Sequence, residues 1–269
     1  MSTAPAPADL LDLALRAARA AGRFLVQERP ADLDVAATKT SPTDVVTAMD
    51  RGSEELVVRT LRAERPDDGV LGEEGAAATG STGVRWVVDP IDGTVNYLYG
   101  LPEWAVSIAA EVDGEVVASV VAAPALGETW TATRGGGAHL DGRPLRRGRG
   151  ADLGQALVAT GFSYEARHRA LQAQVAAQVL PRVRDLRRAG SAALDLCGVA
   201  GGRHDAYFER GTHHWDVAAA ALVAREAGVR VGGLRGAPES EELVLAAADP
   251  LFDDLHALLD AAWPASWPA

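Results

Sequence analysis

The segment VVDPIDGTVNY, residues 87–97, joins a predicted buried strand to a short acidic loop. Apolar, β-branched residues lead into Asp89, which is typical of a strand that ends at the edge of a sheet. Pro90 fixes φ and withholds an N–H, so we expect a rigid loop. Gly93 allows close approach of a ligand, and Thr94 begins a helical turn whose free N–H groups suit an anion such as phosphate. Carboxylates beside such a cradle suit magnesium.

The spacing of Asp89 and Asp92 separates two kinds of phosphate chemistry. Haloacid-dehalogenase-type phosphatases also place Asp-x-Asp-Gly-Thr after an apolar strand, and their first aspartate is a covalent nucleophile. Here the residue two before Asp92 is Pro90, and no lysine follows Lys39, whereas that family normally has a downstream lysine. A covalent aspartyl-phosphate mechanism is therefore disfavoured.

Two further acidic clusters lie at predicted strand ends or helix starts. GEEG contains Glu73, and HHWDVA contains Asp216. Taken singly, such residues are more often turn formers or helix caps than ligands. Asp44, at the start of a helix predicted over residues 44–65, is interpreted as a cap.

Three other residue types near these clusters are interpreted structurally. His213 and His214 are expected to face solvent or line a pocket, because carboxylates already suffice for magnesium. Trp215 is expected to pack in the core behind the loop. Cys197, on the predicted helix SAALDLCGVA, is expected to be a small buried residue.

Composition limits the class of protein. The chain has 269 residues, is 48% hydrophobic and carries a formal net charge of −11, which suits one large domain or two moderate ones. The acidic balance argues against direct binding to nucleic acid or an anionic membrane. The single Cys197 excludes an internal disulfide and fits a reducing compartment. No apolar run approaches the ~18 residues of a membrane span, and the first residues lack the blocks of a signal peptide, so we expect a cytoplasmic protein.

The order of the predicted elements changes near residue 150. The first part combines amphipathic helices over 9–27 and 44–65 with an antiparallel meander over 104–134. The second part alternates predicted helices (166–180, 191–201, 216–228 and 250–263) with predicted strands (156–159, 184–187, 204–208, 229–232 and 243–247). We therefore expect an α+β domain over 1–149 and an α/β domain over 150–269.

GEEG, WVVDPIDGTVNY and WDVAAAALVAREAGV resemble, in this order and at suitable separations, the signatures of the inositol monophosphatase family. KTSPTDVVTAMD precedes them, and the likeness covers nearly the whole chain. The resemblance implies a layered αβαβα sandwich of the inositol monophosphatase/fructose-1,6-bisphosphatase type. It also implies a homodimer that hydrolyses small phosphate monoesters with two or three Mg²⁺ ions, without a covalent intermediate. Lithium often inhibits this family by occupying a metal site.

The resemblance assigns the metal ligands by position. Glu73, Asp89 and the backbone carbonyl of Ile91 would bind the first magnesium ion. Asp89, Asp92 and Asp216 would bind the second. Glu73 would also help to hold a weaker third ion through water.

The resemblance assigns the catalytic residues in the same way. Thr94 and Glu73 would orient the attacking water, and Asp50 would support Thr94. Lys39 matches a basic residue that the family has near this group. The alternative is that Lys39 has no role and is the only lysine by chance, because the chain is biased toward arginine. The phosphate would lie against the amides of Gly93 and Thr94.

A separate set of residues bears on the alcohol that leaves. Gly190, Ser191 and Ala192 match residues at the substrate hydroxyls, and Glu209 matches a glutamate that bonds the inositol ring, with Asp216 also among the substrate contacts. Their presence favours inositol 1-phosphate. Histidinol phosphate is the main alternative, and other sugar or nucleotide phosphates share the same metal ligands.

A role of another class stays open at this point. Some bacterial members of the family associate with the transcription or ribosomal RNA machinery. The acidic composition argues against direct RNA contact, but a regulatory role through a protein partner is compatible with it.

Overall fold

The computed structural model describes residues 5–31, 33, 35, 37–38, 45–264 and 267. In this part of the chain the α-helices are α1 (Pro7–Gln27), α2 (Ala48–Glu64), α3 (Thr94–Tyr99), α4 (Ala166–Val179), α5 (Ala192–Ala200), α6 (His214–Glu226) and α7 (Leu251–Ala262). Short 3₁₀ turns lie at Leu153–Gln155, Leu180–Arg182 and Leu234–Gly236. None of the described helices is long and apolar enough to span a bilayer.

The larger sheet has the strand order β10-β9-β8-β7-β6-β5-β3-β4. Its strands are β3 (Gly69–Gly72), β4 (Ala77–Ala78), β5 (Val84–Asp92), β6 (Ala105–Val112), β7 (Glu115–Ala123), β8 (Glu128–Thr133), β9 (Gly137–Leu140) and β10 (Arg143–Leu145). All neighbours pair antiparallel except β3 and β5, which are parallel. The predicted meander is thus the middle of this sheet.

The smaller sheet has the order β12-β11-β13-β15-β14. Its strands are β11 (Leu157–Thr160), β12 (Asp185–Arg187), β13 (Ala206–Glu209), β14 (Arg230–Gly232) and β15 (Val244–Ala247). β11 pairs parallel with β12 and β13, whereas β15 runs antiparallel to both of its neighbours. A separate two-stranded ladder joins β1 (Ala37–Thr38) to β2 (Val45–Val46).

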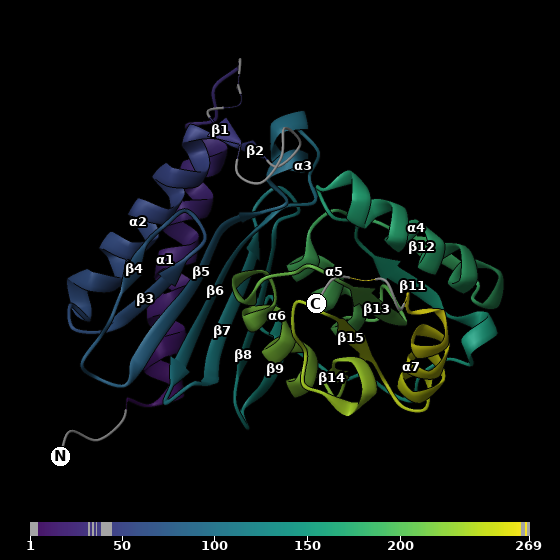
Figure 1. Cartoon of the computed structure of the whole chain (residues 1–269). Coiled ribbons are helices and arrows are strands. Elements are labelled where there is room, and N and C mark those ends of the chain that lie inside the picture. Colours follow the sequence, from purple (N-terminus) through teal and green to yellow (C-terminus); the bar gives the residue numbers. More distant parts are fainter. Residues whose placement is uncertain are drawn as a thin grey trace.

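The helices and the two sheets form five layers, as Figure 1 shows. Successive strand residues point to opposite faces, so each sheet has two surfaces to cover. One face of the larger sheet packs on α1 and α2, and its other face packs on α5 and α6. The same α5 and α6 cover one face of the smaller sheet, and α4 and α7 cover the other. The predicted αβαβα order is confirmed.

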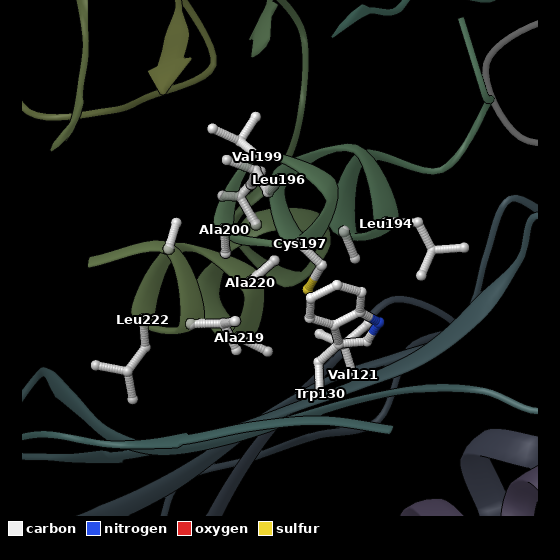
Figure 2. Packing of buried hydrophobic residues seen from close by; sticks show 14 of the residues in the cluster. Val121, Trp130, Leu194, Leu196, Cys197, Val199, Ala200, Ala219, Ala220 and Leu222 are labelled. Atoms are coloured by element: carbon white, nitrogen blue, oxygen red, sulfur yellow. The ribbon is translucent and has the colours of Figure 1, made fainter. Parts of the chain in front are cut away.

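The central layer connects the two sheets through small and aromatic side chains. Figure 2 shows Trp130 of β8 lying against Cys197 of α5, with Ala219 and Ala220 of α6 nearby. Trp130 and Cys197 are both fully buried, as expected for the cysteine. This cluster contains residues from both sides of position 150. A division into domains at that position remains a prediction.

Most predicted elements are confirmed to within a few residues, and one cap is corrected. The second helix begins at Ala48 and is capped by Thr47, whose Oγ1 accepts from the backbone N–H of Met49 at 3.1 Å. The Asp50 carboxylate in turn accepts from the Thr47 N–H at 2.8 Å, which completes a capping box. Asp44, predicted as the cap, lies outside the described residues.

Tyr97 ties α3 to the end of α1. Its hydroxyl donates to the carbonyl of Leu25 at 2.7 Å, in the last turn of α1, where helix carbonyls lack intrahelical partners. Arg29, just beyond α1, donates to the carbonyl of Tyr97 at 3.1 Å and lies over its ring. These contacts set the position of α3 and of Gly93, which precedes it.

Tyr97→Phe removes only the hydroxyl that serves the Leu25 carbonyl. Because the bond is buried, we expect the free energy of unfolding to fall by about 1–3 kcal/mol. Urea denaturation of the purified variant measures this change. Tyr99→Phe is the matched control, because Tyr99 is 77% exposed, and equal effects of both variants would contradict the assignment.

Candidate active site

A β-bulge places Asp89 and Asp92 in the same cavity. Three residues apart on a regular strand, their side chains would point to opposite faces. In β5, Asp89 pairs with Ser107 of β6 and Asp92 pairs with Ala105, so one additional residue lies on β5 between the two pairs. The alternation therefore reverses within the bulge. The reversal is visible in the core: Val87 packs toward α5 and α6, whereas Ile91 packs toward α1 and α2.

Local bonds hold this bulge in place. Pro90 has no N–H to leave unpaired, and its carbonyl accepts from Ser53 Oγ of α2 at 3.1 Å. The Asp89 carboxylate accepts from the N–H of Ile91 at 3.0 Å. Gly93 follows with a left-handed φ of 96°, and a Cβ there would lie 2.9 Å from the carbonyl oxygen of Glu103. A glycine is therefore required where β5 turns into α3.

The cavity beside the bulge has a volume of about 1050 Å³. Of the residues predicted to act in the site, it is lined by Glu73, Asp89, Ile91, Asp92, Gly93, Thr94, Gly190, Ser191, Ala192, Glu209 and Asp216. These residues come from five segments of the sequence. The first turns of α3, α5 and α6 all contribute to the lining, and helix N-termini favour negative charge. Lys39 lies outside the described residues.

Asp92 is bound to the N-terminus of α5. Its carboxylate accepts from the Ser191 hydroxyl and from the N–H groups of Ala192 at 3.3 Å and Ala193 at 2.7 Å. Ser191 Oγ also accepts from the N–H of Leu194 at 3.2 Å, so it caps the helix. Burial raises the pKa of Asp92 to about 7, although these hydrogen bonds oppose the rise. In this structure Ser191 and Ala192, predicted as substrate contacts, thus also position a predicted metal ligand.

Asp89 lies among several negatively charged side chains. Burial raises its pKa well above the ordinary range, and the neighbouring carboxylates of Glu73, Asp92 and Asp216, in decreasing order of effect, raise it further. The pKa of Asp216 is raised for the same reasons, with burial first. A cation among these groups would offset both the burial and the repulsion.

The carboxylate oxygens of this group are donors of the type that magnesium prefers. In the described ranges, no three or more His, Cys, Asp or Glu side chains are arranged as a ready-made metal cage. Magnesium keeps several waters and is usually bound by one or two carboxylates and substrate phosphate. The available oxygens of Glu73, Asp89, Asp92 and Asp216 fit that mode of binding.

Thr94 and Asp50 form a bonded pair. Thr94 Oγ1 lies 2.9 Å from Asp50 Oδ1 and 3.1 Å from the carbonyl of Ile91. Burial raises the pKa of Asp50 to about 6, whereas hydrogen bonds from Thr47 and Thr94 lower it. The predicted support of Thr94 by Asp50 corresponds to a direct contact.

Glu209 lies at another wall of the cavity, on β13. Burial raises its pKa to about 8, although the Tyr207 hydroxyl, which donates to Glu209 Oε2 at 2.9 Å, opposes the rise. A Cβ at Gly161 would lie 2.0 Å from this carboxyl group, so only glycine leaves room for it. A protonated carboxyl can both donate to and accept from a sugar hydroxyl.

The start of α6 is held by residues that the sequence analysis did not connect. His214 Nε2 lies 2.6 Å from the buried Glu111, which also accepts from Arg85 at 2.6 Å. The Asp216 carboxylate accepts from the His213 N–H at 2.7 Å. Trp215 lines the cavity as well as packing on the central cluster, which corrects its assignment to core packing alone.

Two further residues position the site and were not predicted. Glu54 of α2 is buried and accepts from the backbone N–H groups of Glu74 and Ala76, each at 2.9 Å, and thereby holds the GEEG loop. Asn96 of α3 donates to the carbonyls of Glu103 and Ala189. A signal existed for Glu54, because it lies on the same helical stripe as buried Val57 and Leu61.

Ser191→Ala removes both the cap of α5 and the hydroxyl bond to Asp92. We expect the free energy of unfolding to fall by about 1–2 kcal/mol, as for loss of a serine cap. Thermal and urea denaturation measure the change. Ser240→Ala, at an exposed position, is the control; a Ser191→Ala protein as stable as this control would contradict the linkage described.

Comparison with known proteins finds relatives that cover most of this chain. A family model described as the inositol monophosphatase family matches residues 7–264. The Mycobacterium tuberculosis (H37Rv) protein named inositol-1-monophosphatase SuhB is 50% identical over 233 residues, 82% of this chain and 80% of that protein. The Escherichia coli K12 protein named Nus factor SuhB is 39% identical over 229 residues, 84% and 86% of the two chains.

A solved structure has the same fold as this chain. The Thermotoga maritima IMPase superimposes with a TM-score of 0.86 at 30% identity, covering 94% of this chain and 98% of that one. The family match and the sequence identities extend over most of this chain and of its relatives. This chain belongs to the inositol monophosphatase family.

Proposed function

We propose that this protein hydrolyses a small phosphate monoester, with inositol 1-phosphate as the first candidate, by magnesium-activated water and without a covalent intermediate. The observation that carries the proposal is the convergence of Glu73, Asp89, Asp92 and Asp216 on one cavity. The M. tuberculosis relative, named inositol-1-monophosphatase, supports the choice of substrate.

The carboxylates and the carbonyl of Ile91 are the proposed magnesium ligands. Glu73, Asp89 and Ile91 would hold the first ion, and Asp89, Asp92 and Asp216 the second, with Glu73 also serving a weaker third. Bound divalent ions would supply a water of lowered pKa and neutralise charge on the phosphate and the leaving oxygen. Lithium sensitivity is part of the proposal, because lithium would compete for one of these positions.

Thr94, Asp50 and Glu73 are proposed to handle the attacking water. Thr94 can donate its hydroxyl hydrogen to Asp50 and present a lone pair to the water. Asp50, with a pKa of about 6, is mostly ionised at neutral pH and can accept this bond. Lys39 retains its proposed role as a nearby basic group.

The other end of the substrate is proposed to contact Glu209 and the start of α5. The amides of Gly93 and Thr94 would cradle the phosphate, and Gly190, Ser191, Ala192 and Asp216 would face the hydroxyls of the alcohol. Glu209, with a pKa of about 8, can donate a hydrogen bond to one hydroxyl and accept from another. A polyol with adjacent hydroxyls fits this arrangement.

Asp89→Asn is expected to reduce magnesium-dependent phosphate release to the background level, because Asp89 is proposed to contact both main ions. Phosphate release is measured across a magnesium series, and calorimetry reports magnesium binding independently. Asp67→Asn, at an exposed position outside the cavity, is the control and should retain full activity. Near-normal hydrolysis by Asp89→Asn would overturn the ligand assignment.

The substrate is tested by a magnesium-dependent phosphate-release panel. We expect inositol 1-phosphate to be hydrolysed with the highest kcat/KM, ahead of histidinol phosphate, fructose 1,6-bisphosphate and 3′-phosphoadenosine 5′-phosphate. A higher kcat/KM for histidinol phosphate would make histidinol phosphate the preferred substrate in place of inositol 1-phosphate. The enzyme proposal fails if none of the four substrates releases phosphate with magnesium. Phosphate release that is insensitive to chelation would contradict the magnesium-dependent mechanism.

A regulatory role is a second candidate, since the E. coli relative is named a Nus factor. The net charge of −11 favours a protein partner over direct contact with nucleic acid. We also propose that the protein is a cytoplasmic homodimer, as the family resemblance implies. An Asp89→Asn protein that still performs the cellular role would favour the regulatory function.

A further inference from the structure

The first turn of α6 carries a proposed magnesium ligand, so its position against the larger sheet matters. Asp216 and Trp215 lie in this turn, and both line the cavity. The Asp216 carboxylate accepts from the His213 N–H at 2.7 Å, but this bond lies within the turn and caps the helix without placing it on the sheet. Ser107 of β6 donates to the carbonyl of Trp215 over 3.4 Å, which is long for a hydrogen bond. His214 makes a shorter contact with the sheet.

His214 binds Glu111, a buried carboxylate on β6. Glu111 is 2% exposed, and its Oε1 lies 2.6 Å from Nε2 of His214. Its other oxygen, Oε2, accepts from Nε of Arg85 at 2.6 Å. Because an ionised carboxylate can only accept, His214 donates from Nε2. Both oxygens of Glu111 are therefore used, one toward α6 and one toward β5.

Glu111 connects two elements that carry proposed magnesium ligands. Arg85 lies directly opposite Glu111 in the pairing of β5 with β6, and Asp89 follows on the same strand. His214 lies in the same helical turn as Asp216. One carboxylate therefore links the strand that holds Asp89 to the helix that holds Asp216.

The burial of Glu111 costs free energy that its two bonds offset. Val87 and Ala109, on the same face of the sheet, belong to the apolar cluster that packs on α5 and α6. Burial raises the pKa of Glu111, but the bonds from His214 and Arg85 outweigh this effect, so the pKa lies below its ordinary value. Replacing a buried ion pair by well-packed apolar residues is often neutral or stabilising. Accurate placement of α6 accounts for this arrangement better than stability does.

The far end of α6 is attached separately. Glu226, the last residue of α6, accepts from the backbone N–H groups of Gly135 at 2.8 Å and Gly137 at 2.9 Å, at the hairpin between β8 and β9. The residues between the two ends of the helix pack in the central apolar cluster. Loss of the bond between Glu111 and His214 would therefore release the start of α6 and leave the rest of the helix in place.

We infer that Glu111 is a positioning residue of the proposed magnesium site, and that it acts through His214 by fixing Asp216 relative to Asp89. Groups that orient metal ligands without touching the metal commonly change metal affinity by about 10–100-fold when they are removed. Glu111 is not among the described residues that line the cavity, so its effect is indirect. The inference rests on the proposed function, in which Asp216 and Asp89 share the second magnesium ion.

Calorimetry of magnesium binding tests this inference on wild type, Glu111→Ala, His214→Ala and the double variant. We expect each single variant to weaken the binding of one magnesium ion roughly tenfold. Because both variants remove the same contact, the double variant should bind within about twofold of either single variant. Glu111→Gln can accept from Arg85 and donate to a neutral His214, so its affinity should stay within about twofold of wild type. Additive losses in the double variant, or binding by Glu111→Gln as weak as by Glu111→Ala, would overturn the inference.

Two comparisons separate the placement of the turn from general stability. Glu226→Ala releases the same helix at its other end and should leave magnesium affinity within about twofold of wild type. An equal loss of affinity in Glu226→Ala would contradict the inference. His214 is 46% exposed, so His214→Ala should fold even if Glu111→Ala does not. Unchanged magnesium affinity in a folded His214→Ala protein would then count against the inference.

Amide hydrogen exchange in the metal-free protein separates this inference from the phosphatase proposal. The amides of residues 214–220 should exchange faster in His214→Ala than in wild type, whereas those of residues 222–226 should not change. Unchanged exchange over residues 214–220 would overturn the inference. If wild type neither released phosphate nor bound magnesium, the proposed function would fail, and the exchange rates would still decide whether Glu111 places the first turn of α6.

Discussion

The β-bulge between Asp89 and Asp92 is the constraint on which the rest of the site depends. A regular strand would direct one of these carboxylates toward the apolar cluster of the α1–α2 layer, where burying a charge is costly. The additional residue on β5 reverses the alternation, and Pro90 tolerates the interrupted ladder because it has no N–H to pair. The starts of α5 and α6 line the cavity into which the bulge directs Asp89 and Asp92.

Concentrating buried acids in this way is costly, and the fold offsets part of that cost with backbone N–H groups. Asp92 accepts from the first turn of α5 and Asp216 from the start of α6, so two helix N-termini face the same cavity. Asp89 accepts from the N–H of Ile91 and is repelled by Glu73, Asp92 and Asp216. Cations bound among these carboxylates would offset that repulsion.

The two sheets contribute to different parts of the proposed substrate. The larger sheet, α2 and α3 carry groups proposed to bind phosphate and water, among them Asp89, Asp50 and Thr94. The smaller sheet and the start of α5 carry the groups proposed to contact the alcohol, among them Glu209 and Ser191. Variation in the second set can change the alcohol while the first set preserves the chemistry.

Apolar periodicity and turn residues determined nearly every element, because they are local signals, whereas the αβαβα order followed from the resemblance of the sequence motifs to the family. The same resemblance predicted Asp89, Asp92, Glu73 and Asp216 as one group of metal ligands. Only the tertiary structure decided that Ser191 bonds Asp92, that Glu54 holds the GEEG loop, and that Trp267 lines the cavity with Glu209. The hydrogen bonds among these contacts join residues 20 to 99 positions apart, and no local pattern of side chains specifies such pairings.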